Sequence, residues 1–83
     1  MLFTNKIKLL REDRGFLQRK LSASLEIDTP TYSKIERDIR PAKRTHLVAL
    51  VQLLSTDEIE LLTHWLVDKI LEVLNDEREL AVK

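Results

Sequence analysis

The chain has 83 residues with 14 basic and 14 acidic side chains, so its formal net charge is zero, and its length allows one domain with one modest core. The absence of cysteine excludes a disulfide framework, a thiolate metal site and a cysteine nucleophile, and a hydrophobic content of 43% is too high for a disordered chain. The longest apolar run, residues 47–51, cannot span a membrane, and Lys6 and Lys8 interrupt the stretch that a signal peptide would need. We therefore expect a soluble protein of a reducing compartment.

The zero net charge hides a division along the chain. Residues 1–44 hold 11 Lys or Arg against 6 Asp or Glu, a balance of +5, whereas residues 45–83 hold 3 against 8, a balance of −5. Such an asymmetry between halves is more informative than the total, because a basic half can meet a polyanion that the whole chain would not attract.

One glycine and two prolines leave little room for hairpins, so we expect helices throughout. The first is expected over residues 4–14, with Thr4 as its cap and Gly15 as its stop. The second is expected over residues 17–25. Its apolar face, at four-residue spacing, comprises Leu17, Leu21 and Leu25.

A turn at residues 26–28 separates the second helix from a third, which Asp28 caps and in which Pro30 occupies the first turn. The third helix should end within residues 37–41, and its inward residues are Tyr32 and Ile35. A fourth helix is expected over residues 44–54. Its buried face comprises Leu47, Leu50, Val51 and Leu54.

The fifth helix should begin with a capping box, in which Ser55 is the cap and Glu58 stands three residues on, and run to about Asn75. Its charged tail, residues 76–83, is expected to fray. The expected inward stripe comprises Ile59, Leu62, Leu66, Ile70 and Val73, flanked by Val67 and Leu74. Two further apolar residues, Leu61 and Trp65, lie off that stripe.

The second and third helices with their turn form a helix-turn-helix, and the residues around it resemble the Cro/C1-type (XRE-like) DNA-binding domain. The matching residues are Ile7-Lys8-Leu9-Leu10-Arg11, Gly15, Gln18-Arg19-Lys20-Leu21-Ser22, Leu25-Glu26-Ile27, Tyr32-Ser33-Lys34-Ile35-Glu36-Arg37 and Arg40-Pro41. No single element is specific, but their combined spacing is, and the likeness covers about residues 3–66.

The resemblance implies an all-α, five-helix Cro/C1 repressor-like fold with an extended C-terminal helix. The DNA-binding domain would cover residues 1–66, with the helix-turn-helix proper at about 17–37, and residues 67–83 would form a C-terminal extension. The implied function is that of a small cytoplasmic transcriptional regulator of bacterial or phage type, either a repressor or a controller, that binds double-stranded DNA without a cofactor.

Three departures from the family pattern bear on these expectations. Glu26 stands in the turn where the family usually has glycine, so a positive φ there would be strained. Leu17 stands where the family often has a hydroxyl cap. Thr29 and Pro30 occupy recognition-helix positions where glutamines are common, which alters the bases that could be read without challenging the fold.

The third helix is expected to enter the major groove with its N-terminal residues on base edges. The candidates for base contact are Thr29, Pro30, Ser33 and Lys34, with Thr31 as a weaker one. The candidates for phosphate contact are Gln18, Arg19, Arg37, Arg40, Lys43 and Arg44. For each residue alone the alternative is an ordinary solvated side chain, whereas the cluster as a group favours DNA. By resemblance, Arg11 and Glu36 form a structural pair that fixes the recognition helix.

The fifth helix carries more apolar surface than its domain needs, which favours a homodimer on a palindromic site. The interface candidates are Trp65, Val67, Ile70, Leu71, Val73 and Leu74. The acidic residues expected to face water are Asp57, Glu60, Asp68, Glu72, Asp76, Glu77 and Glu79. The alternative is an interaction module or antitoxin whose last helix binds another protein, with DNA binding secondary.

Enzymatic interpretations find little support in the sequence. His46 and His64 lie on different expected helices, without the spacing of metal ligands. No nucleophile–base pattern and no glycine loop for a nucleotide can be identified, so we expect neither a catalytic nor a metal site.

Overall fold

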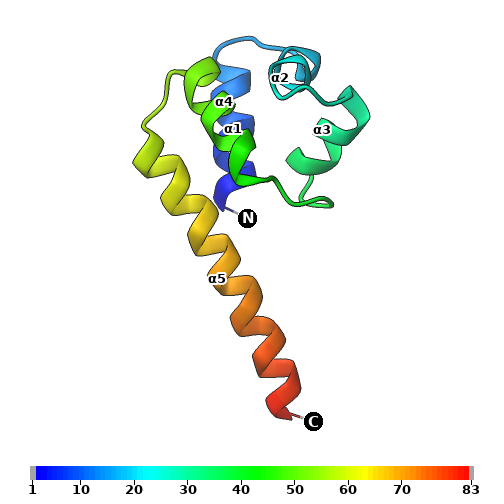
Figure 1. The fold of residues 1–83 in the computed structure, drawn as a ribbon, viewed down its shortest axis with the longest axis vertical. Helices are drawn as coiled ribbons and strands as arrows, with labels where there is room; N and C mark the ends of the chain where they lie inside the picture. The colour runs from blue at the N-terminus through cyan, green and yellow to red at the C-terminus, as the bar shows by residue number, and fades with distance from the viewer. Residues whose placement is uncertain (1, 83) are drawn as a thin grey trace.

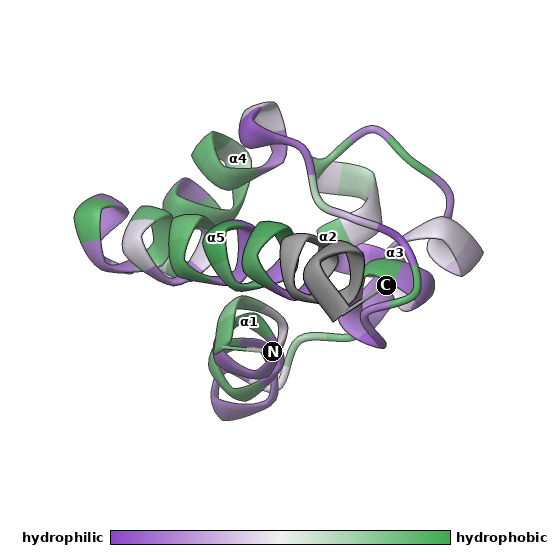
Figure 2. Cartoon of the chain, turned by 90° about the horizontal axis from the view of Figure 1, so that it is seen from below, coloured by the Kyte–Doolittle hydropathy of each residue, from purple (hydrophilic) through white to green (hydrophobic). Residues whose placement is uncertain are grey.

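Five helices form the computed structural model, which describes the backbone of residues 2–82 and the side chains of residues 2–75. They are α1 (Leu2–Asp13), α2 (Gln18–Ser24), α3 (Thr29–Glu36), α4 (Arg44–Leu54) and α5 (Glu58–Val82). Helix α5 packs between α1 and α4 and then extends beyond the other helices (Figures 1 and 2). The described backbone contains no strand, which confirms the prediction of an all-α fold.

One apolar core joins all five helices. Its fully buried side chains are Ile7, Leu21, Tyr32, Ile35, Leu50, Leu54 and Leu61, one or more from each helix. The helical periodicity therefore identified the inward faces of α1, α3 and α4. In α2 the face is shorter than predicted, because Leu17 precedes the helix and is 59% exposed.

The turns around α2 need backbone conformations that favour glycine. Gly15 ends α1 with φ +66°, as predicted from its position. Glu26, in the turn between α2 and α3, has φ 58° although it is not a glycine. The expected strain is therefore present in this turn and costs on the order of 1 kcal/mol. The start of α3 is stabilised by the predicted cap, because the Asp28 Oδ1 atom accepts a hydrogen bond of 2.8 Å from the amide of Thr31.

Two of the predicted helix caps are wrong. Thr4 lies inside α1 and is buried. Ser55 ends α4 in a left-handed conformation with φ 49° and does not begin α5. The start of α5 is capped instead by Asp57, whose Oδ1 atom accepts hydrogen bonds from the amides of Ile59 (2.8 Å) and Glu60 (3.3 Å).

The N-terminus of α1 is capped from a distant part of the chain. The amide of Leu2 donates to Asp68 Oδ1 (3.1 Å), and the amide of Phe3 donates to Asp68 Oδ2 (2.9 Å). Asp68 is only 8% exposed, so its prediction as a solvent-facing acid is wrong. A carboxylate at a helix N-terminus satisfies free amides and complements the helix dipole, which fixes the middle of α5 against α1.

We expect the substitution Asp68→Ala to destabilise the fold by about 1–2 kcal/mol, because two amides at the start of α1 lose their acceptor. Urea unfolding followed by circular dichroism measures this loss. The matched control is Glu72→Ala, which removes an exposed carboxylate one turn further along α5. Equal stability of the two variants would contradict the role of Asp68 as a cap.

The orientation of α5 differs from the prediction. Leu61 is fully buried, and Trp65 packs against the core, although the spacing predicts both off the inward stripe. The residues of the predicted stripe that are exposed instead are Ile59, Leu66, Ile70 and Val73. The acidic side chains Asp76, Glu77 and Glu79, which are predicted to face water, lie outside the described side chains. The described backbone of α5 is helical to Val82, so the helix is longer than the predicted end near Asn75.

Candidate nucleic-acid interface

Helix α3, the expected recognition helix, is fixed to α1 by a bidentate ion pair. Arg11 donates from Nη2 to Glu36 Oε1 (2.8 Å) and from Nε to Glu36 Oε2 (3.0 Å). Arg11 also donates from Nη1 to the carbonyl of Phe16 (2.9 Å), so one side chain joins α1, the segment before α2 and the end of α3. The Glu36 side chain is 2% exposed, so the pair lies beneath the surface that α2 and α3 present.

Burial and hydrogen bonding act in opposite directions on Glu36. Burial alone would raise the pKa of its carboxyl, but hydrogen bonds, chiefly from Arg11, outweigh burial and lower that pKa below its ordinary value. Burial, followed by the neighbouring Glu36 carboxylate, raises the pKa of the Tyr32 hydroxyl. Glu36 is therefore a carboxylate that holds structure, and Tyr32 stays neutral beside it.

Exposed cations lie on α2, at the end of α3 and in the segment that leads into α4. The exposed basic side chains among the predicted phosphate contacts are Arg19, Arg37, Arg40, Lys43 and Arg44, and Lys34 of α3 is exposed as well. Gln18 differs from them because it is half-buried and its Nε2 atom lies 3.5 Å from Glu36 Oε1. Gln18 thus stands at the first residue of α2, next to the ion pair that holds α3.

The charge of Arg40 acts on two titratable side chains, Asp28 at the start of α3 and His46 in the first turn of α4. The pKa of Asp28, at the start of α3, is lowered mainly by its hydrogen bonds with Thr31, and the charges of Lys34 and Arg40 lower it further. The pKa of His46, in the first turn of α4, is lowered by burial and then by Lys43 and Arg40. The charge of Arg40 thus acts on side chains at the starts of both α3 and α4, and at the start of α3 the Asp28 carboxylate already satisfies the helix dipole.

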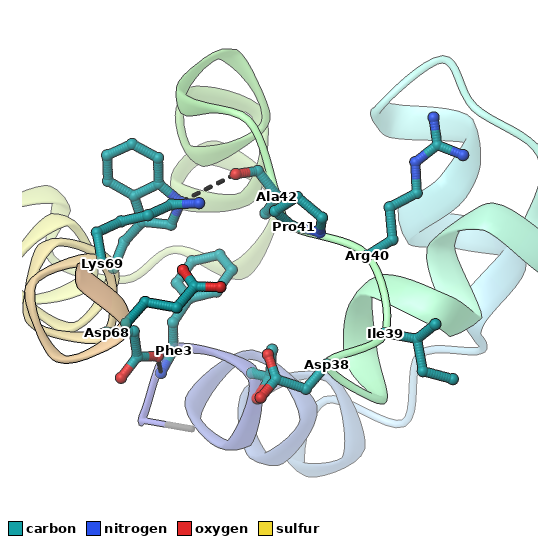
Figure 3. Close-up of a pocket in the computed structure, with 11 residues that line it drawn as sticks. Phe3, Asp38, Ile39, Arg40, Pro41, Ala42, Asp68 and Lys69 are labelled. Atoms are coloured by element: carbon teal, nitrogen blue, oxygen red, sulfur yellow. Dashed lines mark hydrogen bonds between the residues drawn. The ribbon is translucent and has the colours of Figure 1, made fainter. Parts of the chain in front are cut away.

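The loop that carries Arg40 is held in place by α5. Trp65 Nε1 donates to the carbonyl of Ala42 (3.0 Å), and a cavity of about 140 Å³ separates the rest of the loop from α1 and α5. Trp65 also lines this cavity. Figure 3 shows Phe3 and Asp68 around it, while the side chains of Ile39 and Arg40 point away from it. Trp65, in the acidic half of the chain, thus helps to position the loop that carries Arg40, a cation of the basic half.

The predicted base-contact residues lie along the first two turns of α3. Pro30 and Lys34 are exposed, and Ser33 is half-buried. The Thr29 hydroxyl lies 3.1 Å from the hydroxyl of Ser22 on α2, so it also links the two helices of the motif. Lys34 is the long donor of this set, and Pro30 offers an apolar surface without an amide hydrogen.

Sequence reasoning missed two residues that shape this surface. His46 Nδ1 accepts a hydrogen bond from the Lys43 amide (3.2 Å), which orders the start of α4. Its place three residues after the cap position was a usable signal, because capping boxes have that spacing. The contact of Trp65 with the loop had no such signal, since it joins residues 23 positions apart.

These contacts define a helix-turn-helix protein in which the second helix of the motif, α3, is held against α1 by the Arg11–Glu36 pair and is bordered by exposed cations. A family model described as helix-turn-helix (HTH_3) matches residues 7–61, well over half of the chain. The chain belongs to this Cro/C1-type (XRE-family) helix-turn-helix family, a family of DNA-binding transcription regulators. Comparisons with curated proteins and with solved structures gave no match.

A metal site requires several ligand side chains close together, and a membrane span requires a long apolar helix. Among the described residues, no three His, Asp or Glu side chains gather where they could hold a metal ion. No helix in the described part of the chain is both long enough and apolar enough to cross a membrane.

Proposed function

We propose that this protein binds a specific sequence of double-stranded DNA as a homodimeric transcriptional regulator of the cytoplasm, with α3 in the major groove. The observation that carries the proposal is the group of exposed cations on and after α3, comprising Lys34, Arg37, Arg40, Lys43 and Arg44, in front of the buried Arg11–Glu36 pair that fixes this helix. Exposed cations gathered on one surface of a helix-turn-helix match the row of phosphates that a duplex presents.

The exposed cations divide into two roles. Arg40, Lys43 and Arg44 stand on the loop and helix start beyond α3, where they would meet phosphates and set the position of the protein on DNA. Lys34 stands in the second turn of α3, where it would donate to guanine O6 and N7. Pro30 would contact a thymine methyl group, and Thr29 and Ser33 would bond to bases or phosphates.

The two roles predict different effects of alanine substitution on DNA affinity. Lys34→Ala should weaken binding to a duplex selected with the wild type by about 1–3 kcal/mol and relax the preference at one base pair. Arg40→Ala should weaken binding to all duplexes about equally and reduce the slope of log affinity against log salt by about 1. Fluorescence anisotropy titrations at several salt concentrations measure both effects.

Lys8→Ala is the matched control for charge, because Lys8 is an exposed lysine of α1, outside the helix-turn-helix. Its affinity should stay within about twofold of the wild type, as expected for a surface substitution away from the interface. Unchanged affinity in both Lys34→Ala and Arg40→Ala would remove the proposed DNA face.

A heterologous protein partner is the second candidate role, and the exposed apolar residues of α5 are the observation that favours it. The two roles differ in the free state of the protein. A homodimer sediments as a dimer on its own, whereas an interaction module whose partner is absent sediments as a monomer with the same surface uncovered.

A further inference from the structure

The α3–α4 loop, residues 37–43, carries Arg40 and packs little against the rest of the domain. Among these residues, all of which the structure describes, only Ala42 is buried, with 6% of its surface exposed. A cavity of about 140 Å³ lies between the loop and the helices α1 and α5. Atoms that border a cavity lack packing partners on that side, so hydrogen bonds matter more than packing for the position of this loop.

Hydrogen bonds hold the backbone of the loop on both sides of Arg40. Before it, the amides of Ile39 (2.9 Å) and Arg40 itself (3.3 Å) donate to the carbonyl of Lys34 in α3. After it, the carbonyl of Ala42 accepts a hydrogen bond from Trp65 Nε1 (3.0 Å). The first contact joins the loop to the helix that it follows, whereas the second joins it to α5, 23 positions further along the chain.

Arg40 depends on the Trp65 contact more than Lys43 does. Lys43 directly precedes α4, and its amide donates to His46 Nδ1 (3.2 Å) in the first turn of that helix. Arg40 is exposed, and Figure 3 shows its side chain pointing away from the cavity. The start of α4 therefore holds Lys43, whereas the carbonyl side of Arg40 is held through the next two residues, which end at Ala42.

Trp65 is suited to hold the loop because its own side chain is held by the domain. Its ring packs against the apolar core, and Lys69 Nζ lies 5.3 Å from the ring centroid. The indole N–H is therefore a donor in a fixed position. Without it, the carbonyl of the buried Ala42 would lose its partner, and the loop would gain by moving to expose that carbonyl to water.

We infer that Trp65 is a positioning residue for DNA binding: its indole N–H, through the carbonyl of Ala42, holds the loop in the conformation in which Arg40 meets a phosphate. The inference rests on the proposed function, which assigns Arg40 to the DNA backbone. It adds that part of the affinity is decided on α5, by a side chain that acts through the loop. A loop held in its binding conformation raises affinity because less conformational freedom is lost on binding.

Trp65→Phe tests this role, because it removes the indole N–H and keeps an aromatic ring. Its affinity for a duplex selected with the wild type should fall about three- to tenfold, the range expected for one hydrogen bond. The slope of log affinity against log salt should fall toward that of Arg40→Ala. In an Arg40→Ala background, Trp65→Phe should change the affinity by less than about twofold. Fluorescence anisotropy measures all four proteins, under conditions in which urea unfolding shows each to be folded.

Leu62→Ala is the matched control for stability, because Leu62 packs against the core from α5 and does not border the cavity. This variant should be less stable than the wild type but bind DNA within about twofold of it while folded. Wild-type affinity in Trp65→Phe, or an equal loss with and without Arg40, would overturn the inference. An effect of Arg40→Ala alone would leave the proposed DNA face in place, whereas no effect of either substitution would count against that face as well.

A measurement on the wild type does not depend on whether a variant folds. Trp65 is the only tryptophan of the chain, so its indole N–H gives a single resonance in NMR spectra. If the hydrogen bond favours DNA binding, bound DNA must favour the hydrogen bond by the same factor. A selected duplex should therefore slow the exchange of this N–H with solvent by about three- to tenfold. Exchange that the duplex does not slow would overturn the inference.

Discussion

Arg11→Ala should destabilise the fold more than Asp68→Ala and more than the loss of any exposed charge. It leaves the Glu36 carboxylate buried without its bidentate partner, and breaking a buried pair from one side costs about 3–5 kcal/mol. For a chain of this length such a loss lowers the melting temperature by at least about 12 °C. Thermal unfolding at neutral pH measures the shift.

The loss should depend on pH in a defined direction. In the wild type the folded-state pKa of Glu36 is lowered, so its contribution to stability is present above the ordinary carboxyl pKa and disappears as pH falls through the lowered value. Without Arg11, burial acts with less opposition and raises that pKa, so acid relieves the penalty. The deficit of Arg11→Ala relative to the wild type should therefore be largest near neutral pH and shrink toward about pH 4.

Two variants complete this test. Arg14→Ala removes another arginine of α1, whose Nη1 atom reaches only the carbonyl of Leu10, and should change stability little. The double substitution Arg11→Met with Glu36→Leu replaces both charges and should cost less than Arg11→Ala. A double variant as unstable as Arg11→Ala would show that the buried charge of Glu36 does not cause the loss.

Val73→Glu should convert the proposed homodimer to a monomer and thereby remove most of the DNA affinity. The substitution places a charge within the exposed apolar surface of α5, which a second copy would bury. Because a dimer holds two recognition helices at one effective concentration, its loss should weaken binding to a palindromic duplex by about 10²–10⁴-fold. Analytical ultracentrifugation and anisotropy titration measure the mass and the affinity.

Leu9→Glu provides the matched control, because Leu9 is 66% exposed on α1 and lies outside the α5 surface. This variant should sediment as the wild type does and bind DNA with similar affinity. A wild type that sediments as a monomer at high concentration would contradict the dimer, as would a Val73→Glu variant that keeps the mass of a dimer.

Several features that depend on neighbouring residues can be predicted from the sequence. The inward spacing of Tyr32 and Ile35, the stop at Gly15 and the cap at Asp28 each follow from a few consecutive positions, and each is present in the structure. The helix-turn-helix is recognisable because its spacing is local, and the family match over residues 7–61 confirms it. The residues assigned to bases and phosphates remain predictions.

The errors at Asp68 and along α5 concern what distant residues decide. The sequence predicts Asp68 as a surface acid because nothing near it along the chain needs a carboxylate, yet the free amides of α1 lie 65 and 66 positions away. Trp65 and Leu61 are predicted off the inward face because α5 has apolar residues on more than one side. Periodicity describes how residues are spaced on a helix, whereas the rotation of that helix against its domain depends on contacts of this kind.

Selection of binding sites from a pool of random duplexes tests the central claim most directly. If two recognition helices read one duplex, the enriched sequences should share a palindromic consensus with half-sites about one helical turn, roughly 34 Å, apart. Mutation of either half-site should then reduce the affinity of the wild type. A pool that shows no enrichment at moderate salt would contradict the proposal that this protein reads DNA sequence.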